Sequence, residues 1–133
     1  MKALTYIDSG VLISAVCGES DIAEKAMAYL DDPTRDFASS IFVKLEVLPK
    51  AIYNKSESLP FYESFFSNVT TFSNACDAYI QDALSEAETY GLGGMDALHI
   101  LAAKSLNATE FVTNEKPARP MFRTKAIKVI SIR

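Results

Sequence analysis

Short β-prone segments alternate with helical patterns along almost the whole chain, and no tight hairpin turn joins two of the β-prone segments. Antiparallel neighbours can be joined by two residues, whereas parallel neighbours need a longer crossover that is usually a helix. The alternation therefore predicts a single α/β domain over residues 1–133. We expect a central parallel sheet of about four or five strands with helices on both faces.

Apolar periodicity, capping residues and helix-breaking residues predict where the individual elements lie. Pro49 falls inside one helical pattern and should kink or locally open that helix. The predicted strands are 3–7, 36–39, 70–72, 109–113 and 127–132. The predicted helices are 9–16, 20–30, 40–54, 59–69, 75–90 and 96–106.

The composition is that of a globular protein, with 49% hydrophobic and 23% charged residues. No run approaches the roughly 18 apolar residues of a membrane span, and the apolar segment 11–17 is at the short limit for a secretion signal. Cys17 and Cys76 lack metal-type spacing and are too few for a disulfide scaffold. These features favour a cytoplasmic protein with no membrane segment and with reduced thiols.

Charge is distributed unevenly along the chain. Residues 1–115 carry 7 basic and 17 acidic side chains, whereas residues 116–133 carry 6 basic side chains and no acidic one. Such a segment could bind a polyanion, with Lys116, Arg119 and Arg123 as candidates for contacts to phosphates. It could equally be a solvated edge strand whose charges block aggregation. The sequence leaves both interpretations open.

Four carboxylates lie where short apolar runs break. Asp8 and Glu115 directly follow predicted strands, Glu46 lies in the helix after the second strand, and Asp96 lies at the start of the clearest helix. Ligand sites of parallel sheets lie beyond the carboxyl ends of the strands. We therefore expect these four side chains to converge there.

Carboxylates that share a site repel one another, and a cation between them relieves that repulsion. Oxygen ligands without a His or Cys cluster suit Mg²⁺ or Mn²⁺ better than zinc. An ion held in this way serves phosphoryl transfer or phosphodiester hydrolysis, in which it activates the attacking water and stabilises the leaving oxygen. Whether one or two ions bind stays open.

Several of these segments resemble the PIN domain, and within it the VapC-type toxin ribonucleases of toxin–antitoxin systems. The resemblance extends from residue 3 to about residue 132. It is carried by Tyr-Ile-Asp-Ser-Gly-Val-Leu-Ile at 6–13, by the interior Glu46, by Met-Asp-Ala-Leu-His-Ile-Leu-Ala-Ala at 95–103, and by Phe-Val-Thr-Asn-Glu at 111–115.

The resemblance implies a metal-dependent endoribonuclease with RNA as its substrate and Mg²⁺ or Mn²⁺ as its cofactor. It also implies an inhibitory antitoxin partner that occupies the cleft, and a homodimer. The acidic ligands map onto Asp8, Glu46 and Asp96, with the fourth acidic position at Glu115. The polar residues that support this site map onto Ser9, Thr113 and Asn114.

The chain departs from the family pattern at two of its positions. Glu115 stands where the family usually has Asp, and its longer side chain could displace the metal or act through water. Gly10 stands where the family often has Asn or Ser, which removes one hydrogen-bonding side chain.

Two further groups of residues have a structural and a functional interpretation. His99 lies one helical turn after Asp96, but a lone histidine in an apolar helix is more often a core residue with one satisfied nitrogen. Phe61, Phe65 and Phe66 could stack on bases, but their helical spacing favours a core or dimer face.

Two other functions compete with the ribonuclease. One is a PIN-fold module that binds RNA with weak or no nuclease activity. The other is a phosphohydrolase acting on small molecules. A phosphatase with a nucleophilic aspartate needs a second Asp two residues after the first, and Gly10 occupies that position after Asp8.

Overall fold

A computed structural model describes residues 2–133, so Met1 of the predicted domain lies outside the described residues. Within them, five strands form one sheet in the order β3-β2-β1-β4-β5, and every pairing is parallel. The predicted parallel sheet is therefore confirmed. The strands are β1 (Ala3–Ile7), β2 (Arg35–Ser40), β3 (Val69–Ser73), β4 (Glu110–Thr113) and β5 (Lys128–Ser131).

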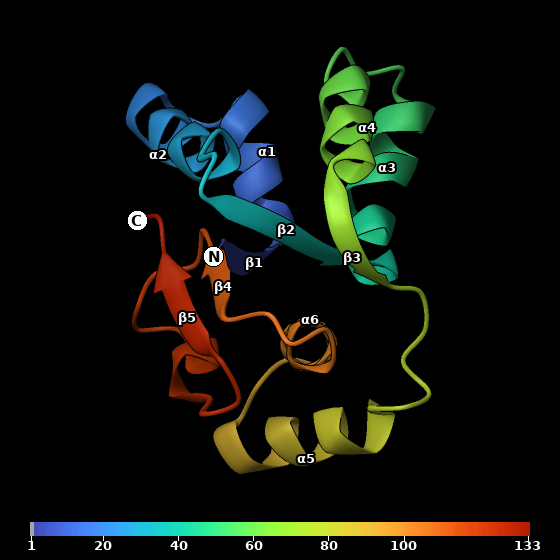
Figure 1. Ribbon diagram of the computed structural model, residues 1–133, viewed down its shortest axis with the longest axis vertical. Coiled ribbons are helices and arrows are strands. Elements are labelled where there is room, and N and C mark those ends of the chain that lie inside the picture. The colour runs from blue at the N-terminus through green and yellow to red at the C-terminus, as the bar shows by residue number, and fades with distance from the viewer. Residues whose placement is uncertain (1) are drawn as a thin grey trace.

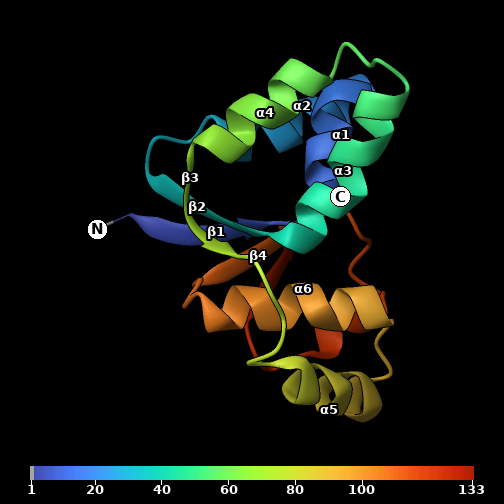
Figure 2. The same cartoon turned by 90° about the vertical axis from the view of Figure 1, so that its right-hand side faces the viewer.

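Helices cover both faces of this sheet, as expected: α1 to α4 lie on one side, and α5 and α6 lie on the other (Figures 1 and 2). No helix in residues 2–133 has both the length and the apolar character needed to cross a membrane. The helices are α1 (Ser9–Cys17), α2 (Ser20–Leu30), α3 (Ile41–Tyr53), α4 (Leu59–Ser67), α5 (Ile80–Tyr90) and α6 (Gly94–Ser105), with a short 3₁₀ helix at Pro120–Arg123.

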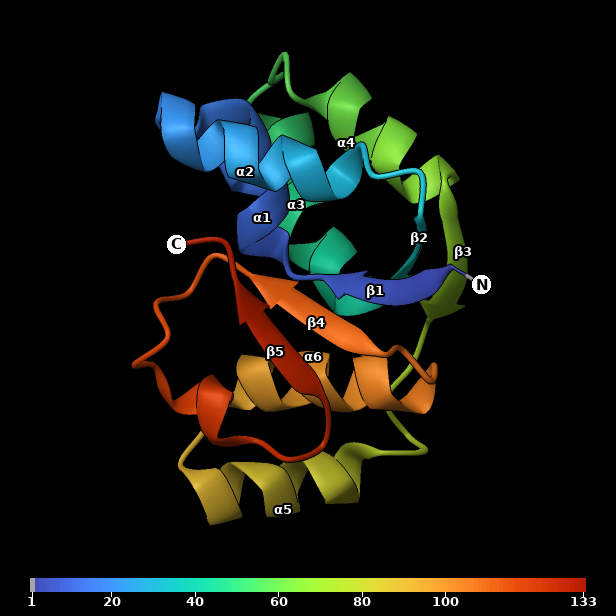
Figure 3. The same ribbon diagram turned by 60° about the vertical axis from the view of Figure 1, so that its left-hand side comes forward.

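The strand order changes direction at the centre of the sheet. The chain runs from β1 outward through β2 to β3 and then returns to β4 on the other side of β1 (Figure 3). Connections on the two sides of β1 therefore leave in opposite directions, and ligands of open α/β sheets bind at such a point, beyond the carboxyl ends of the strands.

The core is densest where β1 and β4 lie side by side. Tyr6 and Ile7 of β1 and Phe111 and Val112 of β4 are fully buried, and the Tyr6 ring stacks on that of Phe111 with centroids 5.1 Å apart. Burial on both faces explains why adjacent residues of each strand, which point to opposite faces, are both apolar. The centre of the sheet is thus rigidly packed just before the chain reaches Asp8.

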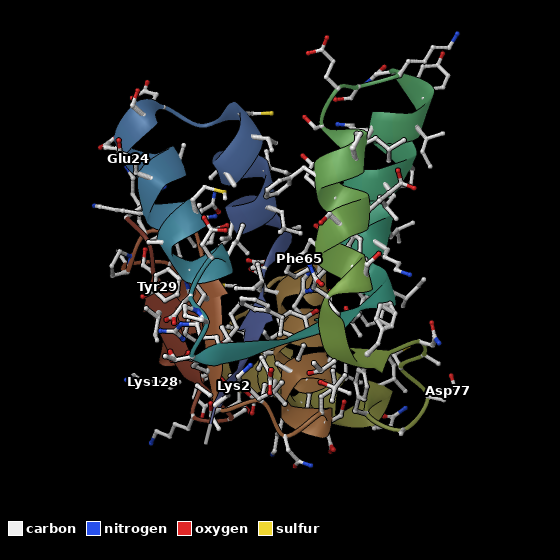
Figure 4. All side chains as sticks on the ribbon, turned by 45° about the horizontal axis from the view of Figure 1, so that its top comes forward. Lys2, Glu24, Tyr29, Phe65, Asp77 and Lys128 are labelled. Carbon is white, nitrogen blue, oxygen red and sulfur yellow. The ribbon has the colours of Figure 1, made fainter. Side chains whose placement is uncertain are left out.

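Side chains elsewhere divide clearly between the core and the surface. Phe65 points into the interior from α4 and packs against Phe37 with ring centroids 5.9 Å apart (Figure 4). The core interpretation of Phe65 is therefore confirmed. Lys128 projects away from the edge strand β5, as a solvated edge requires.

Two helix boundaries and the effect of Pro49 differ from the prediction for local physical reasons. The helix expected over 75–90 begins only at Ile80, because a turn closed by Tyr79 N–H to Cys76 O precedes it. The helix expected over 59–69 ends at Ser67, since β3 begins two residues later. Pro49 does not interrupt α3, because it lies on the exposed side, where water can satisfy the carbonyl group that lacks its N–H partner.

Candidate active site

Asp8 lies at the junction between β1 and α1, next to the end of β4. Its backbone N–H donates to Val112 O (2.9 Å). Its Oδ1 accepts from the backbone N–H of Ser9 (2.9 Å) and its Oδ2 accepts from Thr113 Oγ1 (2.8 Å). Burial raises the pKa of the Asp8 carboxyl, and the positive charge of His99 and the Thr113 hydrogen bond only partly offset this effect. A buried carboxylate is therefore held in a fixed orientation.

Glu46 reaches the same place from the middle of α3. Its Oε1 accepts a hydrogen bond from Ser9 Oγ (2.9 Å) and another from His99 Nε2 (2.5 Å). The His99 hydrogen bond lowers the pKa of the Glu46 carboxyl and outweighs the opposing effect of burial. The side chain remains 36% exposed. Glu46 is thus an ionised carboxylate at the mouth of the site.

Asp96 lies in the first turn of α6, where the helix dipole favours an anion. Even so, the pKa of its carboxyl is raised, first by burial and then by the negative charges of Asp8 and Glu115. Asp96 therefore belongs electrostatically to the same acidic site. Carboxylate oxygens of Asp8 and Glu46 and a ring nitrogen of His99 form a tighter group, in which these atoms all lie within 4.8 Å of one another.

Glu115 lies at the rim of the site. Its side chain is 38% exposed and forms an ion pair with Arg119 (Oε2 to Nε, 3.4 Å). Its backbone is anchored, because its N–H donates to Thr113 Oγ1 (3.2 Å) and its carbonyl accepts from Ser131 Oγ (2.6 Å). Of the four predicted acids, Glu115 is thus the one that the structure directs toward a basic residue.

The three predicted polar residues occupy different places. Ser9 contacts Glu46, and Thr113 is fully buried and contacts Asp8. The Asn114 side chain instead donates from Nδ2 to Ser14 Oγ (3.2 Å). It also fills the space beside Gly10, since a Cβ at Gly10 would lie 2.2 Å from Asn114 Oδ1. The room that a side chain at position 10 would need is taken by Asn114.

The basic segment forms an open hollow beside Glu115, and the structure divides the predicted phosphate contacts. Lys116 and Arg119 line the hollow together with Arg133, whose Nε donates to Asn114 O (2.7 Å). Arg123 lies elsewhere, because its guanidinium donates to the Tyr90 carbonyl at the end of α5 (3.1 Å). Arg133 was not among the predicted phosphate contacts, because its place depends on the pairing of Thr113 with Ser131 between β4 and β5, for which the sequence holds no local signal.

His99 has a larger role in the site than the sequence indicated. It is 2% exposed, which confirms a core position, but both ring nitrogens are hydrogen-bonded: Nε2 to Glu46 and Nδ1 to Tyr6 Oη (2.8 Å). Burial lowers the pKa of His99, but the Glu46 hydrogen bond and the charge of Asp8 outweigh it and leave the pKa raised. Its spacing of three residues from Asp96 on one helix was the available signal.

The donor set fits a hard divalent cation. Burial raises the pKa values of Asp8 and Asp96, and neighbouring negative charges, that of Glu46 for Asp8 and that of Asp8 for Asp96, raise them further; a divalent cation would offset both effects. Carboxylate oxygens are the ligands that Mg²⁺ and Mn²⁺ prefer. These residues could therefore hold such an ion.

A protein-family model described as PIN domain matches residues 5–119. The chain belongs to the PIN domain family. The family resemblance in the sequence is thereby confirmed. No protein in the curated set matches the chain.

Solved structures with the same fold include a toxin–antitoxin complex. A Klebsiella pneumoniae toxin–antitoxin complex matches with a TM-score of 0.70 and 19% identity, covering 99% of this chain and 98% of that chain. VapBC2 from Rickettsia felis, bound to a DNA fragment from its promoter, matches with a TM-score of 0.63 and 18% identity, covering 96% of this chain and 98% of that chain. FitAcB from Neisseria gonorrhoeae matches with a TM-score of 0.60 and 17% identity, covering 96% of this chain and 97% of that chain. At these identities the likeness shows the PIN fold.

Proposed function

We propose that this PIN-domain protein is a Mg²⁺- or Mn²⁺-dependent endoribonuclease and the toxin of a toxin–antitoxin pair. The observation that carries the proposal is the acidic site, in which Asp8 and Glu46 lie together beyond the carboxyl ends of the central strands and their charges help to raise the pKa of Asp96. Membership of the PIN family and the likeness to toxin–antitoxin structures support it.

In this proposal, Asp8, Glu46 and Asp96 would hold the cation, and a cation bound there would supply Lewis-acid chemistry for phosphodiester hydrolysis. Hydrogen bonds from Thr113 and Ser9 would keep the carboxylates of Asp8 and Glu46 in place. Positioning of this kind supplies much of the rate enhancement in phosphodiester cleavage, because the protein has little covalent chemistry to perform.

RNA phosphates on either side of the cleaved bond would be held by the hollow lined by Lys116, Arg119 and Arg133. Glu115 lies in the same hollow and pairs with Arg119, so it keeps one guanidinium close to the acidic site. Contacts to phosphates position a nucleic acid without reading its sequence. The hollow would therefore set affinity and register and leave sequence choice to other residues.

An antitoxin would bind over the same opening. A groove that includes Glu46 extends between α1 and α3, and its lining includes Ile13, Val47 and Tyr62. Leu45 of α3 is 63% exposed. An apolar antitoxin segment laid in this groove would cover Glu46 and block access to the acids. The homodimer and the cytoplasmic location stay predictions.

One observation favours a second function, a PIN-fold module that binds RNA with little cleavage. Glu115 is directed toward Arg119 at the rim, so the fourth acidic position contributes less negative charge to the site than an inward-facing acid would. The basic hollow would serve RNA binding equally well in either function.

The deciding experiment is cleavage of a labelled structured RNA by the wild-type protein and by Asp96→Asn. Asn retains the size of the side chain but removes the charge that a hard cation needs, so we expect cleavage to fall by at least about a hundredfold. Asp82→Asn is the matched control, since Asp82 also lies in the first turn of a helix but is exposed on α5. Its activity should equal that of the wild type.

A second arm repeats the assay in EDTA, where cleavage should stop and should return when Mn²⁺ is added in excess. Cleavage that persists in EDTA or in Asp96→Asn would contradict the proposed mechanism. Tight RNA binding by a pure wild-type protein that cleaves no RNA would favour the binding module.

A further inference from the structure

A buried chain of hydrogen bonds links four elements behind the acidic site. Ser40 Oγ lies 2.7 Å from Tyr6 Oη, Tyr6 Oη lies 2.8 Å from His99 Nδ1, and His99 Nε2 lies 2.5 Å from Glu46 Oε1. Tyr6 and Ser40 are fully buried, and His99 is 2% exposed. We call this set, from Ser40 through Tyr6 and His99 to Glu46, the hydrogen-bond chain.

One end of this chain, Ser40, is the last residue of β2 and precedes α3 directly, and the other end, Glu46, lies within α3. Ser40 caps the helix, because its Oγ accepts from the backbone N–H of Phe42 (3.2 Å), and Glu46 lies in the middle of the same helix. Between them the chain passes through Tyr6 of β1 and His99 of α6. The chain therefore ties the helix that carries Glu46 to the two elements next to Asp8 and Asp96.

The direction of the His99–Glu46 bond follows from its partners. An ionised carboxylate can only accept, so His99 Nε2 must carry a hydrogen. The other ring nitrogen faces the hydroxyl of Tyr6, which can donate or accept and so satisfies Nδ1 whether or not the ring is protonated. The Nε2–H donor is therefore present in either charge state of His99.

This bond also orients the free oxygen of Glu46. Both His99 Nε2 and Ser9 Oγ donate to Oε1, which leaves Oε2 free of these two donors. The imidazole itself is held by aromatic edges, with ring centroids 5.9 Å from Tyr6 and 6.2 Å from Phe42. A glutamate side chain that is 36% exposed would otherwise sample several rotamers.

We propose that His99 is a positioning residue of the cation site: its Nε2–H fixes Glu46 with Oε2 turned to the cation, and Tyr6 fixes the imidazole. This inference rests on the proposed metal dependence. It also assigns His99 a role other than ligand, although its Nε2 lies within the tight group formed with Asp8 and Glu46. A metal ligand needs a lone pair on the nitrogen, and Nε2 carries a hydrogen here.

The test is Mn²⁺ binding to the metal-free protein, measured by electron paramagnetic resonance. This measurement does not depend on RNA cleavage. Removing an outer hydrogen-bond partner of a metal ligand typically weakens binding about 10- to 100-fold. We expect this loss for His99→Leu, which keeps bulk but no donor. His99→Gln can still place an N–H near Glu46, so it should bind Mn²⁺ more tightly than His99→Leu.

Tyr6→Phe tests the next contact in the hydrogen-bond chain, the one between Tyr6 Oη and His99 Nδ1. It should weaken Mn²⁺ binding in the same direction as His99→Leu but less, because the ring remains while the partner of Nδ1 is lost. Tyr79→Phe is the matched control, since Tyr79 is also buried and its hydroxyl also pairs with a strand serine, Ser73 Oγ (2.8 Å). Its Mn²⁺ affinity should equal that of the wild type.

Each outcome separates the two levels of the proposal. Wild-type affinity in Tyr6→Phe or His99→Leu would overturn the positioning role alone. An equal, large loss in His99→Gln and His99→Leu would overturn it in favour of His99 as a ligand. A wild-type protein that does not bind Mn²⁺ would overturn the metal dependence as well. Thermal unfolding identifies any variant that fails to fold. If the His99 variants do not fold, the Mn²⁺ affinity of Tyr6→Phe compared with that of Tyr79→Phe decides whether the positioning role holds.

Discussion

The acidic side chains at the two ends of the sheet have different partners. At the amino end, Arg35 of β2 contacts Glu110 of β4, donates from Nε to Asp32 Oδ2 (3.0 Å) and donates from Nη1 to Thr5 Oγ1 (3.1 Å). The Arg35 guanidinium also lies over the Tyr29 ring, 4.7 Å from its centroid. We call this group the Arg35 cluster. Its acids are neutralised by a cation that the chain itself supplies.

At the carboxyl end, Arg119 pairs with Glu115 at the rim of the site. The acids further in have no such partner: within residues 2–133, the ion pairs formed by Asp8 and Glu46 involve only His99. The pKa values follow this contrast. Hydrogen bonds from Thr34, with help from Arg35, lower the pKa of Asp32, whereas burial raises that of Asp8. The fold thus pairs one acidic group with its own arginine, and in our proposal the other group binds an external cation.

The largest expected effect comes from breaking the Arg35 cluster. Arg35→Met would leave Glu110 and Thr5 without their cationic partner, and removing one member of a buried pair is strongly destabilising. Both Arg35 and Glu110 keep some exposure, so we expect a loss of about 2–3 kcal/mol in the free energy of unfolding. Urea denaturation would measure it.

Lys2→Met is the control for that variant. Lys2 pairs with Asp36 at 3.8 Å on the surface, with both side chains about half exposed, and such pairs contribute less than about 1 kcal/mol. If Arg35→Met cost no more than Lys2→Met, the amino end would not be the structural counterpart that the comparison requires.

The pH dependence of stability should differ between the two ends. A folded-state pKa above the unfolded value means that the folded protein binds protons more tightly. Without metal, stability should therefore fall as the pH rises from about 4 through the folded pKa values of Asp8 and Asp96. His99 adds a loss of the same sign above about pH 6.5, and the lowered pKa of Glu46 acts in the opposite direction.

Each group contributes at most about 1.4 kcal/mol per pH unit. Chemical denaturation between pH 4 and pH 8 in EDTA would give the slope, and Asp8→Asn should flatten it. Lowered pKa values such as that of Asp32 act with the opposite sign, because their stabilisation is lost as the pH falls. A metal-free protein whose stability rises steadily over this range would contradict the account of the carboxyl end.

The smallest expected effect concerns the basic hollow, which lies beside the carboxyl end. In an Asp96→Asn background, Arg133→Ala should weaken binding of unrelated RNAs alike and reduce the slope of log affinity against log salt by about 1. Arg123→Ala is the control, because Arg123 is bonded to Tyr90 away from the hollow. Equal effects of the two variants would show that the hollow is not the RNA-binding surface.

Much of this molecule follows from local sequence pattern. The strand that ends at Ile7 is apolar except at Thr5 and Asp8 follows it, so both the strand and the acid at its carboxyl end could be predicted. The position of Asp96 in the first turn of a helix was equally local. Parallel topology then placed both residues at the same edge of the sheet.

What escaped prediction depends on contacts between distant elements. The His99–Glu46 bond requires α6 to approach α3, and neither helix reveals its neighbour in its own sequence. The Asn114 side chain fills the space beside Gly10 because of the way in which α1 packs against the end of β4. Arg133 enters the hollow because of the β4–β5 register, which periodicity alone does not set.

The most direct test of the comparison is the stabilisation of the folded protein by Mn²⁺ in the wild type, in Asp8→Asn and in Arg35→Met. At a concentration 100 times the dissociation constant, a cation that binds only the folded state adds about 2.7 kcal/mol to the free energy of unfolding. We expect this increment in the wild type and in Arg35→Met, although the latter starts from lower stability, and we expect it to vanish in Asp8→Asn. An equal increment in Asp8→Asn, or none in the wild type, would contradict the claim that the carboxyl end is built for a divalent cation.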